Sequence, residues 1–317
     1  MMAYHKNNNN SNMNASVDEL DHRNFFATYY PLFLVIMGTI LNVLTYIILY
    51  RPIFRDSMRQ STLYYMRAIA IFDILMLYGW NLDHFLYRAY GFMLQTWSIP
   101  TCKLCSFLNY FASQVSAWLR VSICFERCLA LNWPHKLSSY QSKTVLIVIS
   151  CLVIVFTLIN LHFILFACYF NENGTMNLNA HLYQIYPLWD YINLVIYNCV
   201  PFILMVSFNS NVIYHLMRFR YVGAIQNARI QHRSISITLI ITTFLFLIMT
   251  IPATICYAFF YAIASRFVLH LFDYILYTYH ILSFPIYLIT LREFRQEIYS
   301  LIVRTRWYRT ELLFHYR

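Results

Sequence analysis

Residues 234–265 read SISITLIITTFLFLIMTIPATICYAFFYAIAS and contain no charged side chain. A helix needs about 20 apolar residues to cross the hydrocarbon core of a bilayer, so this stretch is long enough for one crossing. The rest of the chain agrees, because 60% of its 317 residues are hydrophobic and only 11% are charged. A soluble domain carries about 25% charged residues. The sequence therefore predicts an integral membrane protein.

Six further stretches have a similar length and apolar character, and two of them carry charges inside the apolar run. They are residues 24–50, 60–87, 101–131, 144–171, 191–217 and 274–291, the last beginning near Phe267. A membrane β-barrel would show short alternating segments instead. We predict an all-α membrane protein with a seven-transmembrane-helix bundle over residues 25–291. A disordered extracellular segment, 1–24, precedes it, and residues 292–317 form a short amphipathic eighth helix and a cytoplasmic tail.

Lysine and arginine are distributed unevenly between alternate loops. One set of loops holds fifteen: Arg51, Arg55, Arg59, Lys136, Lys143, Arg218, Arg220, Arg229, Arg233, Arg292, Arg295, Arg304, Arg306, Arg309 and Arg317. The other holds five: Lys6, Arg23, Arg88, Lys103 and Arg266. Basic residues gather on the cytoplasmic side, so the N-terminus is expected outside and the C-terminus in the cytoplasm. The net charge of +10 thus reflects membrane topology rather than binding of nucleic acid.

Three Asn-x-Ser/Thr glycosylation sequons fall in segments expected outside, which agrees with this orientation. They begin at Asn9, Asn14 and Asn173.

Two predicted helices carry ionisable residues at membrane depth, where such residues are costly and mark functional sites. Asp73 lies in mid-helix, and Asn42 of the first helix is its expected polar partner. Asp73 can be a polar clamp between helices, part of a switch, or both. Arg120 lies one turn from Ser116 on the same helical face. Because a lone arginine in hydrocarbon is very costly, we expect Arg120 to pair with Asp73.

Glu126 and Arg127 close the third predicted helix just before a basic loop. Charged side chains at this depth can simply reach for the membrane surface. Their place beside the loop favours contact with a cytoplasmic partner.

The order of these landmarks resembles the rhodopsin-like G protein-coupled receptors over nearly the whole chain, from Asn42 to Phe294. Asn42, the Ala70–Asp73 segment, and Glu126-Arg127-Cys128 resemble motifs of the first three helices. Phe246 and Pro252 match the sixth helix, Pro201 matches the fifth, and Ser283-Phe284-Pro285-Ile286-Tyr287 resembles the Asn-Pro-x-x-Tyr motif. The resemblance implies signalling through a heterotrimeric G protein at the plasma membrane, with an activation switch formed by Glu126, Arg127, Asn209, Phe246, Pro252 and Tyr287.

Several positions depart from the family pattern. Cys128 replaces the motif tyrosine, Thr250 replaces the sixth-helix tryptophan, and Ser283 replaces the seventh-helix asparagine. In the family, that asparagine helps to hold a sodium ion with the residues at Asp73 and Ser116. The resemblance with these changes implies that Arg120 takes the place of the cation in a polar core of Asn42, Asp73, Ser116, Arg120 and Ser283.

The resemblance also bears on the ligand. The aspartate of amine receptors falls at Asn109 and the retinal lysine falls at Tyr277, which disfavours both ligand types. Further positions resemble the invertebrate FMRFamide and myosuppressin receptors, which implies an amidated neuropeptide. They are Trp118-Leu119, Glu126-Arg127-Cys128, Phe202, Asn209, Tyr287-Leu288-Ile289-Thr290 and Phe294-Arg295. Carboxylates near the outer helix ends, Asp83 above all, suit a cationic ligand, with aromatic side chains around them. The alternative is an aromatic belt at the membrane interface with solvated acids, which the aromatic side chains alone favour. The candidate ligand residues are Trp80, Asp83, His84, Asn109, Asp190, Asp273 and Tyr277.

Among the eight cysteines, Cys102 and Cys168 are candidates for an outer disulfide, which the resemblance implies, and Cys105 is a competing partner. No cysteine or histidine spacing resembles a metal site, and no nucleophile–base constellation predicts an enzyme. We expect no cofactor. Two alternatives remain: a chemosensory or small-molecule receptor of the same fold, and a transporter or channel.

Overall fold

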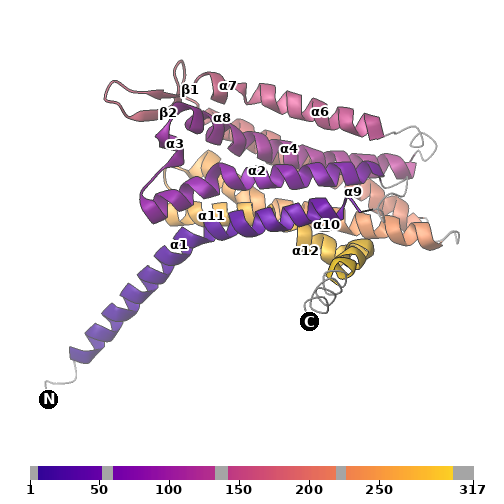
Figure 1. Cartoon of the computed structure of the whole chain (residues 1–317), viewed down its shortest axis with the longest axis horizontal. Coiled ribbons are helices and arrows are strands. Elements are labelled where there is room, and N and C mark those ends of the chain that lie inside the picture. Colours follow the sequence, from indigo (N-terminus) through magenta and orange to yellow (C-terminus); the bar gives the residue numbers. More distant parts are fainter. Residues whose placement is uncertain (1–5, 52–59, 133–141, 219–225, 303–317) are drawn as a thin grey trace, which may run out of the picture.

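The computed structural model describes residues 6–51, 60–132, 142–218 and 226–302, without side-chain detail for 6–24, 60, 131, 142, 216, 218 and 226–233. Within these ranges the chain is almost entirely helical, and the long helices lie alongside one another in an elongated bundle (Figure 1). Many of the basic residues from which the orientation was predicted lie outside the described residues. They belong to segments 52–59, 133–141, 219–225 and 303–317.

The first half of the bundle consists of α1 (Lys6–Ile48), α2 (Gln60–Tyr90), the short α3 (Leu94–Trp97) and α4 (Ile99–Asn132). Helix α1 packs on α2, and α2 packs on α4. A Cβ atom on Gly79 of α2 would lie 3.2 Å from the backbone nitrogen of Asn109, so glycine here allows close approach of α2 and α4. Helix α1 begins at Lys6, so the segment predicted to be disordered is helical from there, and this N-terminal part of α1 projects away from the bundle (Figure 1).

The fourth predicted helix is shorter than expected. Helix α6 spans Ser142–Ile159, and a separate turn, α7, spans Leu161–Leu165. The strands β1 (Ala167–Phe170) and β2 (Met176–Ala180) follow and pair as an antiparallel hairpin. The prediction of one helix to residue 171 was therefore wrong beyond Ile159, because the chain leaves the helix to pair in the hairpin and to bring Cys168 beside α4.

The second half contains α8 (Leu188–Asn193), a π-helical segment η2 (Leu194–Cys199), α9 (Val200–Arg218) and α10 (Gln226–Ile255). A second π-helical segment, η4 (Cys256–Phe260), extends α10. Then come α11 (Arg266–Tyr279) and α12 (Ser283–Thr290), separated by a turn, and residues 292–302 are again helical. The seventh predicted helix is thus divided in two.

Among the described residues, four helical stretches are long and apolar enough to cross a membrane: Phe25–Ile48, Ser61–Tyr90, Leu188–His215 and Ser234–Phe260. Large apolar side chains also point outward from the bundle, for example Ile147 of α6 and Ile248 of α10, 61% and 62% exposed. Such a surface suits lipid rather than water. The architecture is that of a helical membrane protein.

The helical segment 292–302 turns back on the bundle. Phe294 is fully buried against the rings of Phe284 and Tyr287, with ring centroids 5.5 and 5.9 Å away. Arg295 donates to the backbone carbonyl of Ile289 at 2.5 Å, at the end of α12. The amphipathic segment predicted after residue 291 is therefore present as a helix, and Phe294 packs into the protein.

Candidate functional site

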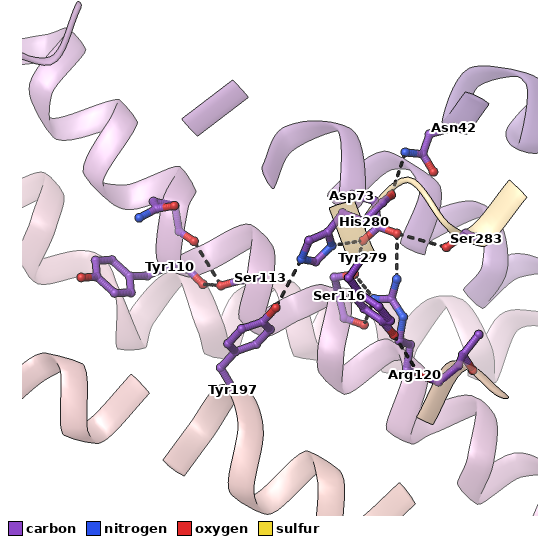
Figure 2. Close-up of polar contacts among 12 residues, drawn as sticks. Asn42, Asp73, Tyr110, Ser113, Ser116, Arg120, Tyr197, Tyr279, His280 and Ser283 are labelled. Carbon is purple, nitrogen blue, oxygen red and sulfur yellow. Dashed lines mark hydrogen bonds and ion pairs between the residues drawn. The ribbon is translucent and has the colours of Figure 1, made fainter. Parts of the chain in front are cut away.

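The carboxylate of Asp73 lies at the centre of the bundle and is fully buried (Figure 2). Its Oδ2 atom lies 2.7 Å from the Arg120 guanidinium, so the ion pair predicted from the sequence is confirmed. Ser116 donates to Oδ1 at 2.6 Å, and Ser283 donates to Oδ2 at 3.4 Å. These groups come from α2, α4 and α12, so one carboxylate connects three helices.

His280 completes this site, and sequence reasoning missed it. Its Nδ1 atom lies 2.8 Å from Oδ1 of Asp73. Because a carboxylate only accepts, Nδ1 carries the proton, and in the neutral ring Nε2 is left as an acceptor. The Tyr197 hydroxyl lies 3.2 Å from Nε2 and can donate to it. Side-chain contacts therefore connect Tyr197 of η2, His280 of the α11–α12 turn, Asp73 of α2 and Arg120 of α4 in that order (Figure 2).

The turn between α11 and α12 positions His280. Pro285 has no backbone N–H and its ring conflicts with the carbonyl four residues earlier, that of Ile281. The amides of His280, Ile281 and Leu282 bond instead to carbonyls three residues earlier, at 3.1 Å each. The helix tightens there and frees the carbonyl of His280. Asn42 of α1 donates to this carbonyl at 3.1 Å, so its expected contact with Asp73 was wrong.

Arg120 is held by more than its ion pair. It also donates to the Ser116 backbone carbonyl at 3.1 Å, and its guanidinium lies 5.0 Å from the centroid of the Tyr279 ring. Both charges are desolvated, which is costly unless each is paired and hydrogen-bonded. The Arg120 guanidinium contacts the Asp73 carboxylate, the Ser116 carbonyl and the face of the Tyr279 ring. It therefore lies against the side of Asp73 where a bound sodium ion would have to sit.

A second polar cluster lies toward the far end of α4, away from the disulfide. Glu126 is buried, and its carboxylate accepts from the hydroxyls of Ser61 and Thr62 at the start of α2. Arg127 is also buried and donates to Thr62. Its guanidinium lies 4.0 Å from the Glu126 carboxylate. Thr62 therefore contacts both charged residues and ties this end of α4 to α2.

A cavity of about 30 Å³ lies between the two clusters. Arg120, Thr62 and Tyr287 line it, together with apolar side chains of α10. A space of this size has room for about one water molecule. The cavity thus connects the Asp73 cluster and the Thr62 cluster within the bundle.

The other predicted switch residues lie where helices meet. Asn209 of α9 donates to Thr243 of α10 at 2.9 Å. Phe246 is buried with its ring edge against Tyr197 and Tyr279, at centroid distances of 5.5 and 5.6 Å. Two residues before Pro252, Thr250 donates to Asn198 of η2 at 2.7 Å. Asn198 was missed because the sequence carries no sign that the helix widens into a π-helix there.

At the disulfide end, the predicted ligand residues form a packed aromatic group. Trp80 stacks between His84 and Tyr277, with ring centroids 4.5 and 5.3 Å away. The Tyr277 hydroxyl donates to Asn109 at 2.8 Å. These four residues, from α2, α4 and α11, therefore lie together.

The three carboxylates expected at this end each have a partner within the protein. Asp83 accepts from the backbone amide of Gln95 at 2.9 Å and so holds the α3 turn. Asp190 accepts from the Tyr110 hydroxyl at 3.2 Å, and Asp273 accepts from the Tyr257 hydroxyl at 2.6 Å. They lie on three different elements and do not form one acidic cluster.

The disulfide joins Cys102 of α4 to Cys168 of β1, whose Cα atoms are 6.1 Å apart. Cys105, the expected competitor, is a free buried thiol. Asn173 is exposed in the turn of the hairpin, as a glycosylation acceptor must be. The side chains of Asn9 and Asn14 lie outside the described part of the chain.

In the ranges with described side chains, no group of three or more His, Cys, Asp or Glu residues is placed to hold a metal ion. Neither a protein-family model nor a curated protein matches this sequence. The geometry of the helices and their buried polar clusters therefore carries the functional argument.

Proposed function

We propose that this chain is a rhodopsin-like G protein-coupled receptor of the plasma membrane, with its N-terminus extracellular and its C-terminus cytoplasmic. In this proposal α1, α2, α4, α6, α9, α10 and the broken pair α11–α12 are seven membrane spans. The Lys/Arg distribution of the loops supports this orientation. The charges of α4 are compatible with a span because Arg120, Glu126 and Arg127 are buried inside the protein rather than turned to lipid.

The observation that carries the proposal is the pair of buried clusters at two levels of α4. Asp73 gathers Arg120, His280 and Ser283 in mid-bundle, and Thr62 holds Glu126 and Arg127 at the expected cytoplasmic end. Both clusters join α4 to α2. The Asp73 cluster also depends on the tightened turn between α11 and α12. The hydrogen bonds and ion pairs of the two clusters can be broken and replaced when the helices move, as a switch between two conformations requires.

The proposed mechanism is a population shift. A ligand that binds the active arrangement better than the resting one increases the active population. The moving elements are α9 with the preceding η2, and α10. Asn209 of α9 bonds to Thr243 of α10, and Asn198 of η2 bonds to Thr250 of α10. Release of Arg127 from Thr62 then exposes a cation to the heterotrimeric G protein. No reaction is catalysed, and the ligand is an amidated neuropeptide that reaches the disulfide end from outside.

The test is second-messenger output in cells that express wild type or Arg127→Ala, challenged with a library of amidated neuropeptides. Arg292→Ala is the matched control, because Arg292 is an exposed arginine at the same end of the bundle. We expect a peptide response in wild type and control that is lost in Arg127→Ala at equal surface expression. Silence of all three at the surface would contradict the peptide assignment, and a full response of Arg127→Ala would contradict the coupling role.

A further inference from the structure

His162 of α7 and Trp189 of α8 form an aromatic pair at the disulfide end. Their ring centroids lie 4.2 Å apart with an interplanar angle of 64°. Tyr110 and Phe163 pack against the indole from the bundle side. On the other side, the His162 ring meets Tyr183, which is 45% exposed, so the pair lies directly beneath the surface.

Each ring holds a buried polar atom with no hydrogen-bond partner: Nε2 of His162 and Nε1 of Trp189. The indole N–H can only donate. Nδ1 of His162 lies 3.1 Å from the Ile159 carbonyl, which can only accept, so Nδ1 carries the proton and Nε2 can only accept. The pair therefore offers one unused donor and one unused acceptor, although its edge-to-face geometry does not join them to each other.

Burial lowers the pKa of His162 below its ordinary value, which keeps the ring neutral at pH 7. A buried donor or acceptor without a partner carries a desolvation penalty, and a ligand that supplies the missing partner recovers it. The occupant must present an acceptor and a donor close together. A carboxamide does so, since its oxygen accepts and its nitrogen donates twice.

Asp190 follows Trp189 directly in the sequence, and Tyr110 contacts both residues. The Asp190 carboxylate accepts from Tyr110, and as an ionised group it has room for further donors. A second amide N–H can use this capacity. A ligand carboxylate has no donor for Nε2 and would be repelled by Asp190, and an ammonium group has no acceptor for the indole.

We propose that His162, Trp189 and Asp190 form a carboxamide-binding subsite under the 181–187 loop. The inference rests on the proposed function, because it assigns one contact of the receptor's ligand. The carboxamide can be the end group of an amidated peptide or the side chain of Gln or Asn.

The experiment measures thermal stabilisation of the purified full chain in detergent. The probes are phenylalaninamide, phenylalanine and the dipeptide Phe-Gln with a free C-terminus. We expect phenylalaninamide to act at a concentration about tenfold or more below phenylalanine, because the acid leaves one buried group unpaired. Trp189→Phe and His162→Phe keep the rings but remove the polar atoms, and each should abolish this preference. Trp189→Leu and His162→Leu, which also lack a polar side-chain atom, replace any variant that does not fold.

The matched controls are Trp97→Phe and His181→Phe, which change exposed residues of the same two types at the same end and should keep the preference. Equal action of amide and acid, no stabilisation by either, or a preference that survives in both ring variants would overturn the subsite. A response to Phe-Gln equal to that of phenylalaninamide assigns the contact to a side-chain amide. Amide-selective stabilisation without nucleotide exchange on any G protein would keep the subsite and end the receptor proposal.

Discussion

Each buried charge in this bundle loses its hydration and therefore needs a partner of opposite charge. Arg120 is 6% exposed and Asp73 is fully buried, so neither can be hydrated by bulk water. Each stabilises the charged form of the other, and removal of one leaves a charge in a low-dielectric interior. The pair is therefore expected to be intolerant of single neutral substitutions.

We predict that Arg120→Leu destabilises the protein by about 3–5 kcal/mol, the cost of breaking a buried pair on one side. Asp73 would keep its bonds to Ser116, His280 and Ser283 but lose its cation. Thermal unfolding of the purified protein and basal second-messenger output measure the two effects, and basal output should change. The double variant Asp73→Asn/Arg120→Leu should recover part of the stability. Unchanged basal output at unchanged surface expression would refute the switch role of the pair.

Sequence reasoning was sufficient for the Asp73–Arg120 pair, because an arginine in an apolar helix requires a carboxylate and Asp73 was the deepest one. It was insufficient for His280, since a single histidine interrupts neither the charge pattern nor the apolar pattern of the sequence. Asn42 was assigned the wrong partner for a related reason. Its true acceptor is a backbone carbonyl that becomes free only because the helix tightens near Pro285.

At the scale of elements, apolar length predicted α2, α4 and α10 well, together with the C-terminal part of α1. It failed where the chain changes structure within a run that carries no charge. Residues 160–171 contain no charged side chain and are still largely apolar, yet they form α7 and β1. The division of α11 from α12 was also not predicted, although Pro285 was a signal for it, because a proline within a membrane helix can also be accommodated by a gentle kink.

We predict that Pro285→Ala alters signalling, because it removes the cause of the tightened turn between α11 and α12. The new amide can bond to the Ile281 carbonyl, which favours a continuous helix and draws His280 away from Asp73. Basal second-messenger output should change at equal surface expression. Pro100→Ala is the control, because Pro100 lies in the first turn of α4, where proline is tolerated and its loss changes little. Identical basal output of Pro285→Ala and wild type would exclude the turn from the switch.

At the scale of the whole molecule, the described helices form one bundle with a disulfide-linked hairpin at one end and the Glu126–Arg127 cluster toward the other (Figure 1). The orientation of these ends relative to the membrane was predicted from loop charges. Helix geometry does not determine it, because the same bundle could be inserted either way.

The orientation predicts that Asn173 receives a glycan. In a background with Asn9→Gln and Asn14→Gln, the expressed protein should show one glycosidase-sensitive band shift. Asn173→Gln should abolish the shift, whereas Asn171→Gln, a nearby exposed asparagine outside any sequon, should retain it. A protein that never carries the glycan although it reaches the cell surface would argue for the opposite orientation.

The Asp73–Arg120 contact has an electrical consequence. Moving one elementary charge through the full membrane potential involves about 2.3 kcal/mol per 100 mV. A cation that entered and left the centre of the bundle would feel part of that field, and its occupancy would follow the voltage. Arg120 is covalently attached and its charge is cancelled by Asp73, so the pair can move with its helices while the field does almost no net work on it. Depolarisation of the cell should therefore leave the balance between resting and active states unchanged at this site.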